Sequence, residues 1–103
     1  MRIPQTVIDD IRARADILRV IEACGTTLQV RGRRATGLCP FHDDHHPSLQ
    51  VDTQKQLWFC GPCHMGGDVF QFVKLHDHVN FPEAVRRVAA ICGLQYLLPE
   101  DKP

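Results

Sequence analysis

Apolar residues recur at helical spacing through the first quarter of the chain. The apolar positions are Ile8, Ile11, Ala15, Leu18 and Ile21. Thr6 and Asp9 have the spacing of a capping box, which marks the start of a helix. Asp16 can cap a second, shorter helix, and Gly25 can end it. Residues 1–25 are therefore predicted to form N-terminal helices.

The period of the apolar positions changes to two in the next segment, which is typical of strands. Leu28 and Val30 alternate with polar neighbours, and Gly32 permits a turn, so this segment is predicted to be a β-hairpin. Two further short strands are predicted at residues 48–51 and 57–59. The polar residues 52–55 are predicted to form the turn between them. The predicted sheet occupies residues 26–67, and its strands are too short to stand alone.

Helical periodicity returns in the last third of the chain. Asp68 can cap one helix, and Asn80 opens a capping-box-like segment that starts another. One face of the second helix carries Val85, Val88, Ala89 and Cys92. Gly93 is a stop signal, so residues 68–93 are predicted to form C-terminal helices.

Together these segments predict an α+β fold in which helices flank a small antiparallel β-sheet. The 103 residues match one ordinary domain in length, and we assign residues 1–98 to it. Residues 99–103, with their prolines and charges, are predicted to be a linker or tail.

The charge of the chain is balanced overall but unevenly placed. The formal net charge is zero, which gives the whole molecule no strong attraction to nucleic acid or to an anionic membrane. Residues 1–38 nevertheless carry seven arginines against four acids. No segment is apolar for long enough to span a bilayer, and the N-terminus lacks the order of a signal peptide. We therefore expect a cytoplasmic protein without a membrane partner.

Two pairs of ligand-type residues repeat one spacing. Cys39 and His42 form a Cys-x2-His pair, and Cys60 and Cys63 form a Cys-x2-Cys pair seventeen residues further on. A tight turn points both members of such a pair at one ion, and two turns supply the four ligands of tetrahedral Zn²⁺. Because four protein ligands leave no open position, the pattern predicts one structural zinc ion that contributes folding free energy to a sheet too short to stand alone.

Two enzymatic interpretations of the cysteines are weaker. The sequence WFCGPC at residues 58–63 differs from a thioredoxin active site only by an inserted phenylalanine. That chemistry needs the first cysteine at a helix N-terminus, but Gly66 and Gly67 interrupt any helix leaving the motif. A zinc-dependent deaminase would need His-x-Glu and Pro-Cys-x-x-Cys, and neither motif is present.

Other histidines and cysteines have simpler interpretations. Three histidines that could compete for the ion are His45, His46 and His64. Only His42 repeats the two-residue spacing, so we interpret the other three as solvated loop residues. Cys24 and Cys92 each precede a glycine at a predicted helix end, and we interpret them as small buried apolar groups. A disulfide or an additional metal ligand is the alternative for these two.

The combination of motifs resembles the N-terminal zinc-binding domain of bacterial replicative DNA primases. The resemblance is carried by GRRATGLCPFH at residues 32–42, Pro47-Ser48, Lys55-Gln56, the Cys60/Cys63 pair and Gly66-Gly67-Asp68. It implies a zinc ribbon whose exposed face helps to recognise single-stranded template DNA where RNA primer synthesis starts. It also implies a separate RNA polymerase domain, so we expect no catalytic centre in this chain. The primase RNA polymerase domain and the replicative helicase are the implied protein partners.

Candidate DNA contacts lie in or beside the turns of the predicted sheet. The basic ones are Arg31, Arg33, Arg34 and Lys55, which can contact phosphates. Trp58 or Phe59 can stack on an unpaired base, and we select Trp58, although strand alternation sends one of the two rings inward. Both rings packing under the zinc site is the alternative. A stand-alone protein-interaction module that contacts a helicase or polymerase is the alternative function.

Overall fold

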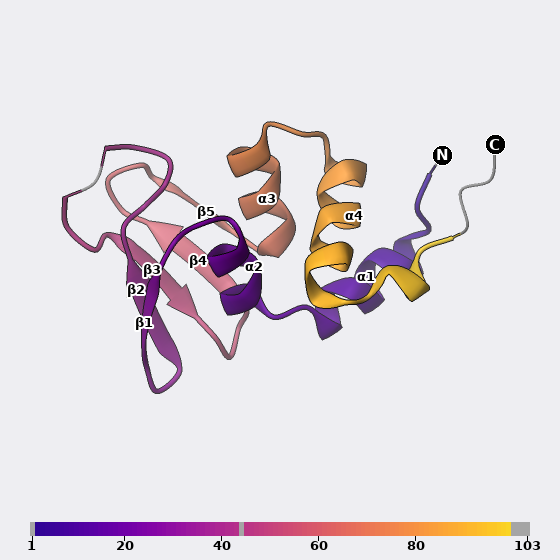
Figure 1. Cartoon of the computed structure of the whole chain (residues 1–103), viewed down its shortest axis with the longest axis horizontal. Coiled ribbons are helices and arrows are strands. Elements are labelled where there is room, and N and C mark those ends of the chain that lie inside the picture. The colour runs from indigo at the N-terminus through magenta and orange to yellow at the C-terminus, as the bar shows by residue number, and fades with distance from the viewer. Residues whose placement is uncertain (1, 44, 100–103) are drawn as a thin grey trace.

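A five-stranded antiparallel sheet forms one end of the molecule, and helices form the other (Figure 1). The structure is a computed structural model and describes residues 2–43 and 45–99. The strands are β1 (Leu28–Arg31), β2 (Arg34–Gly37), β3 (Leu49–Asp52), β4 (Leu57–Cys60) and β5 (Met65–Gly67). The helices are α1 (Gln5–Arg14), α2 (Ile17–Ala23), α3 (Val69–Asp77) and α4 (Phe81–Cys92), followed by the 3-10 turn η1 (Gln95–Leu97).

Each strand of the sheet pairs with its neighbour in sequence, in the order β1-β2-β3-β4-β5. This up-and-down order places the β1–β2 and β3–β4 turns at one end of the sheet. The β2–β3 and β4–β5 connections lie at the opposite end. The predicted α+β zinc-ribbon architecture, a small antiparallel sheet with flanking helices, is confirmed.

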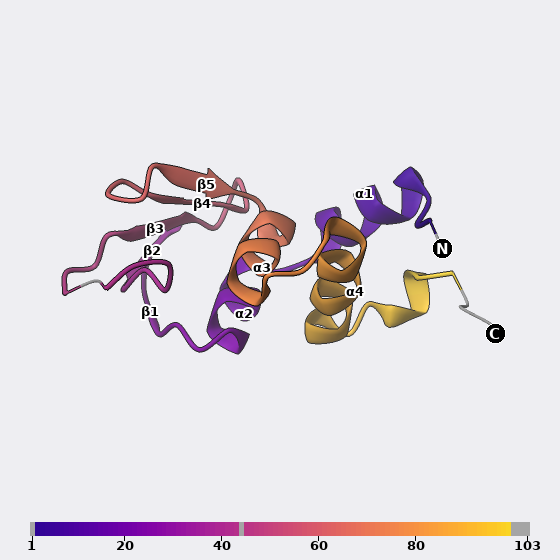
Figure 2. The same cartoon turned by 90° about the horizontal axis from the view of Figure 1, so that it is seen from above.

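The helices α2 and α3 stand beside the sheet, and α1 and α4 lie further from it (Figures 1 and 2). The principal extents are 46, 27 and 19 Å, so the sheet and the α1/α4 end are well separated. Alternate side chains of the strands point inward, and Leu49, Val51 and Cys60 are at most 1% exposed. Phe70 and Phe72 on α3 are fully buried and join this sheet core to the helices.

Most of the predicted helix caps are present. Asp16 accepts a hydrogen bond from the Leu18 N–H at the start of α2, and Asp68 accepts one from the Gln71 N–H at the start of α3. Asn80 caps α4 by accepting from the Glu83 N–H. These side chains satisfy N–H groups that have no partner inside the helix, which is why each helix begins where it does.

The predicted capping box at the first helix is wrong. The residue before α1 is Pro4, and no side chain caps this helix. Asp9 instead accepts a hydrogen bond from the Gln5 side chain and pairs with Arg12 at 3.0 Å. The helix therefore starts two residues earlier than Thr6 would require, so Asp9 falls inside α1.

A strand that the sequence did not predict, β5, completes the sheet. Gly66 lies opposite Phe59, and Gly67 lies opposite Trp58. A Cβ at Gly66 would lie 2.7 Å from the backbone oxygen of Trp58, closer than real Cβ atoms approach. Gly66 therefore lets β5 pass close to β4, whereas a Cβ at Gly67 would lie 2.8 Å from the Gln71 side chain of α3.

Two further expectations concern the ends of the chain and the membrane. Residues 100–103 of the predicted tail lie outside the described residues. Within the residues that the structure describes, no helix has the length and apolarity to cross a membrane.

Candidate metal centre

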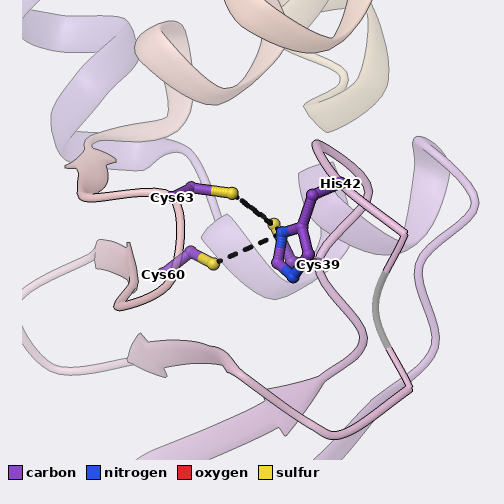
Figure 3. A group of neighbouring side chains, drawn as sticks. All are labelled: Cys39, His42, Cys60 and Cys63. Atoms are coloured by element: carbon purple, nitrogen blue, oxygen red, sulfur yellow. Dashed lines mark hydrogen bonds between the residues drawn. The ribbon is translucent and has the colours of Figure 1, made fainter.

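Four side chains from two separate connections converge at one end of the sheet (Figure 3). Cys39 and His42 belong to the β2–β3 connection. Cys60 is the last residue of β4, and Cys63 lies in the turn before β5. One ligand atom from each of the four lies within 4.8 Å of the others. The structure therefore brings together the Cys-x2-His pair and the Cys-x2-Cys pair that were predicted to share one ion.

The distances within this group are close to those of a tetrahedral site. The Sγ atoms of Cys39 and Cys63 are 3.8 Å apart. Two ligands of one tetrahedral zinc ion with Zn–S bonds of 2.3 Å would be separated by about 3.8 Å. The Nδ1 atom of His42 lies 2.8 Å from Cys63 Sγ and 3.9 Å from Cys60 Sγ. A zinc ion would bring both nitrogen–sulfur separations to about 3.5 Å, a small adjustment of the imidazole.

One hydrogen bond shapes each of the two turns that carry the ligands. The Phe41 N–H donates to Cys39 Sγ at 3.4 Å, which fixes the first turn around its sulfur. The His64 N–H donates to the Gly61 carbonyl at 3.0 Å and closes the second turn. His64 adopts a left-handed conformation with φ of 52°, a conformation that glycine adopts with less strain. The two turns are thus shaped by their own backbones as well as by any ion.

Three aromatic rings in mutual contact lie next to the turn that carries Cys39 and His42. The ring centroids of Phe41, Trp58 and Phe72 are separated by 5.2 to 5.3 Å. The pairs Phe41–Phe72 and Trp58–Phe72 meet edge to face, an arrangement that favours aromatic contacts. Phe41 therefore anchors the loop between Cys39 and His42 onto the sheet and α3.

The electrostatics of the group favour a cation. Burial raises the pKa of the Cys39 thiol to about 12, and the neighbouring Cys60 and Cys63 thiols add to this effect. Burial also acts to raise the pKa of Cys60, but hydrogen bonds from the Cys63 backbone and from neighbouring side chains lower it overall. Three thiols packed together cannot all ionise without a compensating positive charge. A divalent cation would supply that charge, and its binding would release the thiol protons.

The donor set fits zinc, and its arrangement does not fit a thioredoxin-like centre. Three sulfurs and one imidazole nitrogen are ligands that Zn²⁺ binds in closed, four-coordinate sites. Cys60 ends a strand and Cys63 lies in a turn, so neither is at a helix N-terminus that would activate a thiolate. Within the described part of the chain, these two cysteines thus lack the helix that redox chemistry would require.

The remaining histidines and cysteines lie outside this group. His45, His46 and His64 are exposed, as expected of loop residues. Cys24 and Cys92 are partly buried and pack against the hydrophobic core, so they are less buried than predicted. Each lies at the end of a helix, where its side chain is only partly covered. Cys24 instead lies near His76 and Asp77.

The predicted basic residues gather at the other end of the sheet. Arg31 and Arg34 are opposite each other in the β1–β2 register, and both are exposed. Arg33 in the turn between them pairs with Asp52 at 3.5 Å. Its carbonyl accepts hydrogen bonds from Thr53, which joins the β1–β2 turn to the β3–β4 turn that carries the exposed Lys55. The four cations thus share one end of the sheet.

The selection of Trp58 as a ring available to DNA is wrong. Trp58 is 2% exposed, and its indole N–H donates to the Asp68 carbonyl at 3.0 Å. Phe59, the next residue, points to the opposite face and is 51% exposed. The sequence indicated which of the two rings is buried, because Trp58 is two residues from Cys60 and therefore lies on the same inward face of β4.

Phe59 continues a row of outward-facing side chains. Successive strand partners across the sheet are Gln29, Thr36, Gln50 and Phe59. All four are exposed or half-exposed, and the exposed face also carries Leu57, which is 44% exposed. The outward face of the sheet therefore combines one aromatic ring and polar groups, and the cations lie at one end of it.

Comparisons with known proteins give consistent matches. The family model described as CHC2 zinc finger matches residues 3–102. DNA primase of Listeria monocytogenes is 42% identical over 105 residues, covering 98% of this chain and 16% of the relative. DNA primase of Staphylococcus epidermidis is 43% identical over 95 residues, covering 92% of this chain and 16% of the relative. The chain therefore spans only a small part of the length of these relatives.

A solved structure matches both the fold and the sequence. The crystal structure of the Aquifex aeolicus primase, comprising its zinc-binding and RNA polymerase domains, superposes with a TM-score of 0.78. The sequences are 34% identical, and the match covers 92% of this chain and 22% of that one.

Proposed function

This chain belongs to the CHC2 zinc finger family of DNA primases, and we propose that it is a zinc-stabilised module that binds single-stranded template DNA. The observation that carries the DNA proposal is the outward face of the sheet. An exposed phenylalanine lies on this face, and a cluster of cations lies at one end of the same sheet, a combination that single-stranded nucleic acid binders use. The match to primases supports a role in RNA primer initiation during DNA replication.

The zinc ion would be structural and would be held by Cys39, His42, Cys60 and Cys63. These ligands lie on two connections of a five-stranded sheet whose strands have only three or four residues. Bound zinc would hold the connections together and would contribute folding free energy to the sheet. Because all four positions are filled by side chains, the ion would not itself bind substrate.

DNA would be bound through two kinds of contact. Arg31, Arg33, Arg34 and Lys55 would contact phosphates, and the Phe59 ring would stack on one base. The outward row also carries Gln29, Thr36 and Gln50, whose side chains could hydrogen-bond to base edges. The zinc site lies at the opposite end of the sheet and would act only by holding the strands in register.

Binding of a fluorescent single-stranded oligonucleotide, measured by anisotropy over a series of salt concentrations, tests the proposal. With four phosphate contacts, log K should fall against log salt with a slope of about −3. Arg34→Ala should reduce this slope by about 0.7. Arg2→Ala is the matched control, because it removes the same charge from a site beside α1 and the start of α4, away from the sheet.

Two outcomes would contradict DNA binding. Affinity that does not change with salt would exclude phosphate contacts, and absence of binding at low salt would favour the protein-interaction function. In that case the RNA polymerase domain of a primase or a replicative helicase would be the partner to test. We place the module in the cytoplasm, where the replication proteins that it resembles act.

A further inference from the structure

A second group of metal-ligand side chains lies among the helices, away from the sheet connections. Cys24, His76 and Asp77 each offer one ligand atom, and these atoms lie within 4.8 Å of one another. From this geometry we propose that the chain has a second zinc site, formed by these three side chains and open to an exogenous fourth ligand. The proposal does not depend on the site at Cys39 or on DNA binding.

Two helix ends bring the three residues together. Cys24 is the C-terminal cap of α2, and His76 and Asp77 are the last two residues of α3. All three side chains are half-buried, with exposed fractions of 31% for His76 and 22% for Asp77. The group is therefore accessible to an ion from solvent and is held on rigid elements rather than on a long loop.

Neighbouring side chains already orient two of the three ligands. The His76 ring is stacked on Phe72, with centroids 6.2 Å apart and an interplanar angle of 9°. Arg87 donates to one Asp77 oxygen at 2.8 Å and to Glu83 at 3.1 Å. The other Asp77 oxygen faces His76 Nδ1 at 2.7 Å. Contacts of this kind around a metal ligand fix its orientation and strengthen binding.

The ligand types select zinc among the common divalent ions. A thiolate, an imidazole and a carboxylate form a mixed set that suits Zn²⁺, whereas Mg²⁺ and Ca²⁺ prefer oxygen alone. Three protein ligands leave a fourth position for water or another small ligand. His76 Nδ1 and the Asp77 oxygen are now 2.7 Å apart. Binding of one zinc ion by both atoms would lengthen this distance by about half an ångström.

The charges of the group are compatible with a divalent cation. Ionised Cys24 and Asp77 would carry two negative charges against the single positive charge of Arg87. Burial raises the pKa of Cys24 to about 11, and the Asp77 carboxylate adds to this effect. The thiol is thus protonated in the metal-free protein, and zinc would displace its proton when it binds.

Cobalt titration of the full 103-residue chain, preloaded with one equivalent of zinc, tests the second site. A thiolate bound to Co²⁺ gives a charge-transfer absorption band in the near ultraviolet. Zinc should stay in the site with three sulfurs, because such sites prefer Zn²⁺ to Co²⁺. We expect about one further equivalent of Co²⁺ to bind, with the intensity of a single thiolate ligand.

Three variants distinguish this site from adventitious binding. Cys24→Ser should abolish the thiolate band, and His76→Phe should weaken Co²⁺ affinity by about 10-fold or more while preserving the ring stack on Phe72. Cys92→Ser is the matched control, because Cys92 is also a half-buried cysteine at a helix end, and it should retain the band. The zinc content before titration should remain at one ion in all three variants.

Several results would overturn the proposal. These are the absence of a thiolate band in the unmodified chain, its persistence in Cys24→Ser, or its equal loss in Cys92→Ser. Unchanged Co²⁺ affinity in His76→Phe would also contradict it, and this variant decides the question if Cys24→Ser does not fold. Loss of the preloaded zinc would instead indicate failure at the Cys39 site, so the two failures are distinguishable.

Discussion

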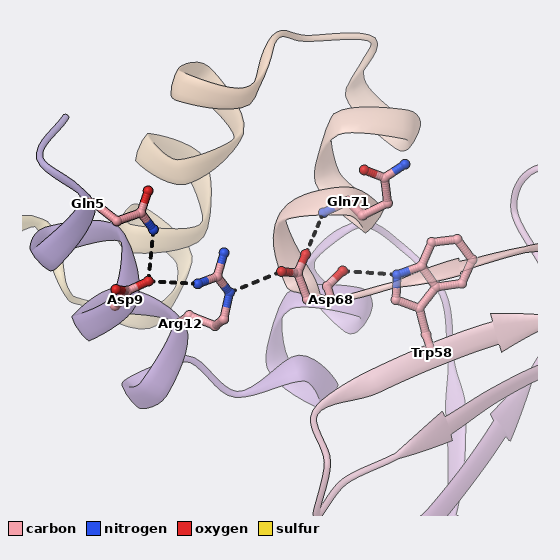
Figure 4. A network of polar contacts seen from close by, with 6 residues as sticks. All are labelled: Gln5, Asp9, Arg12, Trp58, Asp68 and Gln71. Carbon is pink, nitrogen blue, oxygen red and sulfur yellow. Dashed lines mark hydrogen bonds and ion pairs between the residues drawn. The ribbon is translucent and has the colours of Figure 1, made fainter. Parts of the chain in front are cut away.

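The indole N–H of Trp58 donates to the backbone carbonyl of Asp68 at 3.0 Å, which ties β4 to the start of α3 (Figure 4). Asp68 makes two further contacts through its side chain. It accepts from the Gln71 N–H at 2.9 Å and pairs with Arg12 of α1 at 3.1 Å. One aspartate thus connects the sheet, α3 and α1, which lie in different parts of the molecule.

Trp58→Phe should therefore destabilise the fold without weakening DNA binding. The change removes the hydrogen bond and leaves space under a smaller ring, so the free energy of unfolding should fall by about 1–3 kcal/mol. Urea denaturation of the zinc-loaded chain measures this loss. Because Trp58 is buried, oligonucleotide affinity under native conditions should stay unchanged. A large loss of affinity in a folded variant would restore Trp58 as a DNA contact.

Phe59→Ala should have the opposite profile. Stacking of one base on an aromatic ring contributes about 1–3 kcal/mol, so affinity for single-stranded DNA should fall by roughly 5- to 150-fold. Stability should change little, since half of the ring is already exposed. Tyr96→Ala is the control, because Tyr96 is an exposed aromatic residue in η1, remote from the sheet. Equal losses in the two variants would argue against stacking on the sheet.

Removal of zinc should disrupt the sheet before the helices. Chelation would leave the thiols of Cys39, Cys60 and Cys63 without a compensating cation, and the two connections would separate. Amide hydrogen exchange should show loss of protection in β2 to β5 and retention of more protection in α4. Cys63→Ser should reproduce this pattern and lose the zinc ion. Unchanged protection in the sheet after complete chelation would show that the ion is not structural.

Gly66→Ala tests the close approach of β5 to β4. The added methyl group would lie 2.7 Å from the Trp58 carbonyl oxygen, so the strands would have to move apart. We expect a loss of about 1–3 kcal/mol in the free energy of unfolding, measured by thermal or urea denaturation. Gly61→Ala is the control, because a Cβ there would meet only Phe59 at an ordinary 3.8 Å. Equal effects of the two changes would contradict this explanation.

Local signals in the sequence predicted the caps of α2, α3 and α4 and identified the candidate metal ligands. Asp16, Asp68 and Asn80 act within a few residues of their own position, so a short stretch of sequence contains their role. The two ligand pairs are similarly local, since each occupies one turn. The ligand set itself stays a prediction until metal is measured, and so do the domain boundaries.

Features that depend on distant contacts were missed or assigned wrongly. β5 is a strand only because β4 lies beside it, since its three residues include two glycines and carry no strand pattern of their own. The alternation of side chains along β4 turns Trp58 inward, where it packs against Phe41 of the β2–β3 connection. Cys24 gains its neighbours from α3, about fifty residues away in sequence. These relationships arise from packing between elements, which periodicity does not report.

The up-and-down order of the sheet has a consequence for how the chain reaches its native state. Every pairing from β1 to β5 closes a short loop, so the strands can assemble in sequence without a long search, and low contact order favours rapid folding. The helix α1 must instead meet α4, which lies at the other end of the chain. We therefore expect the β-sheet to form early in folding and the N-terminal helix α1 to dock onto α4 in a later step.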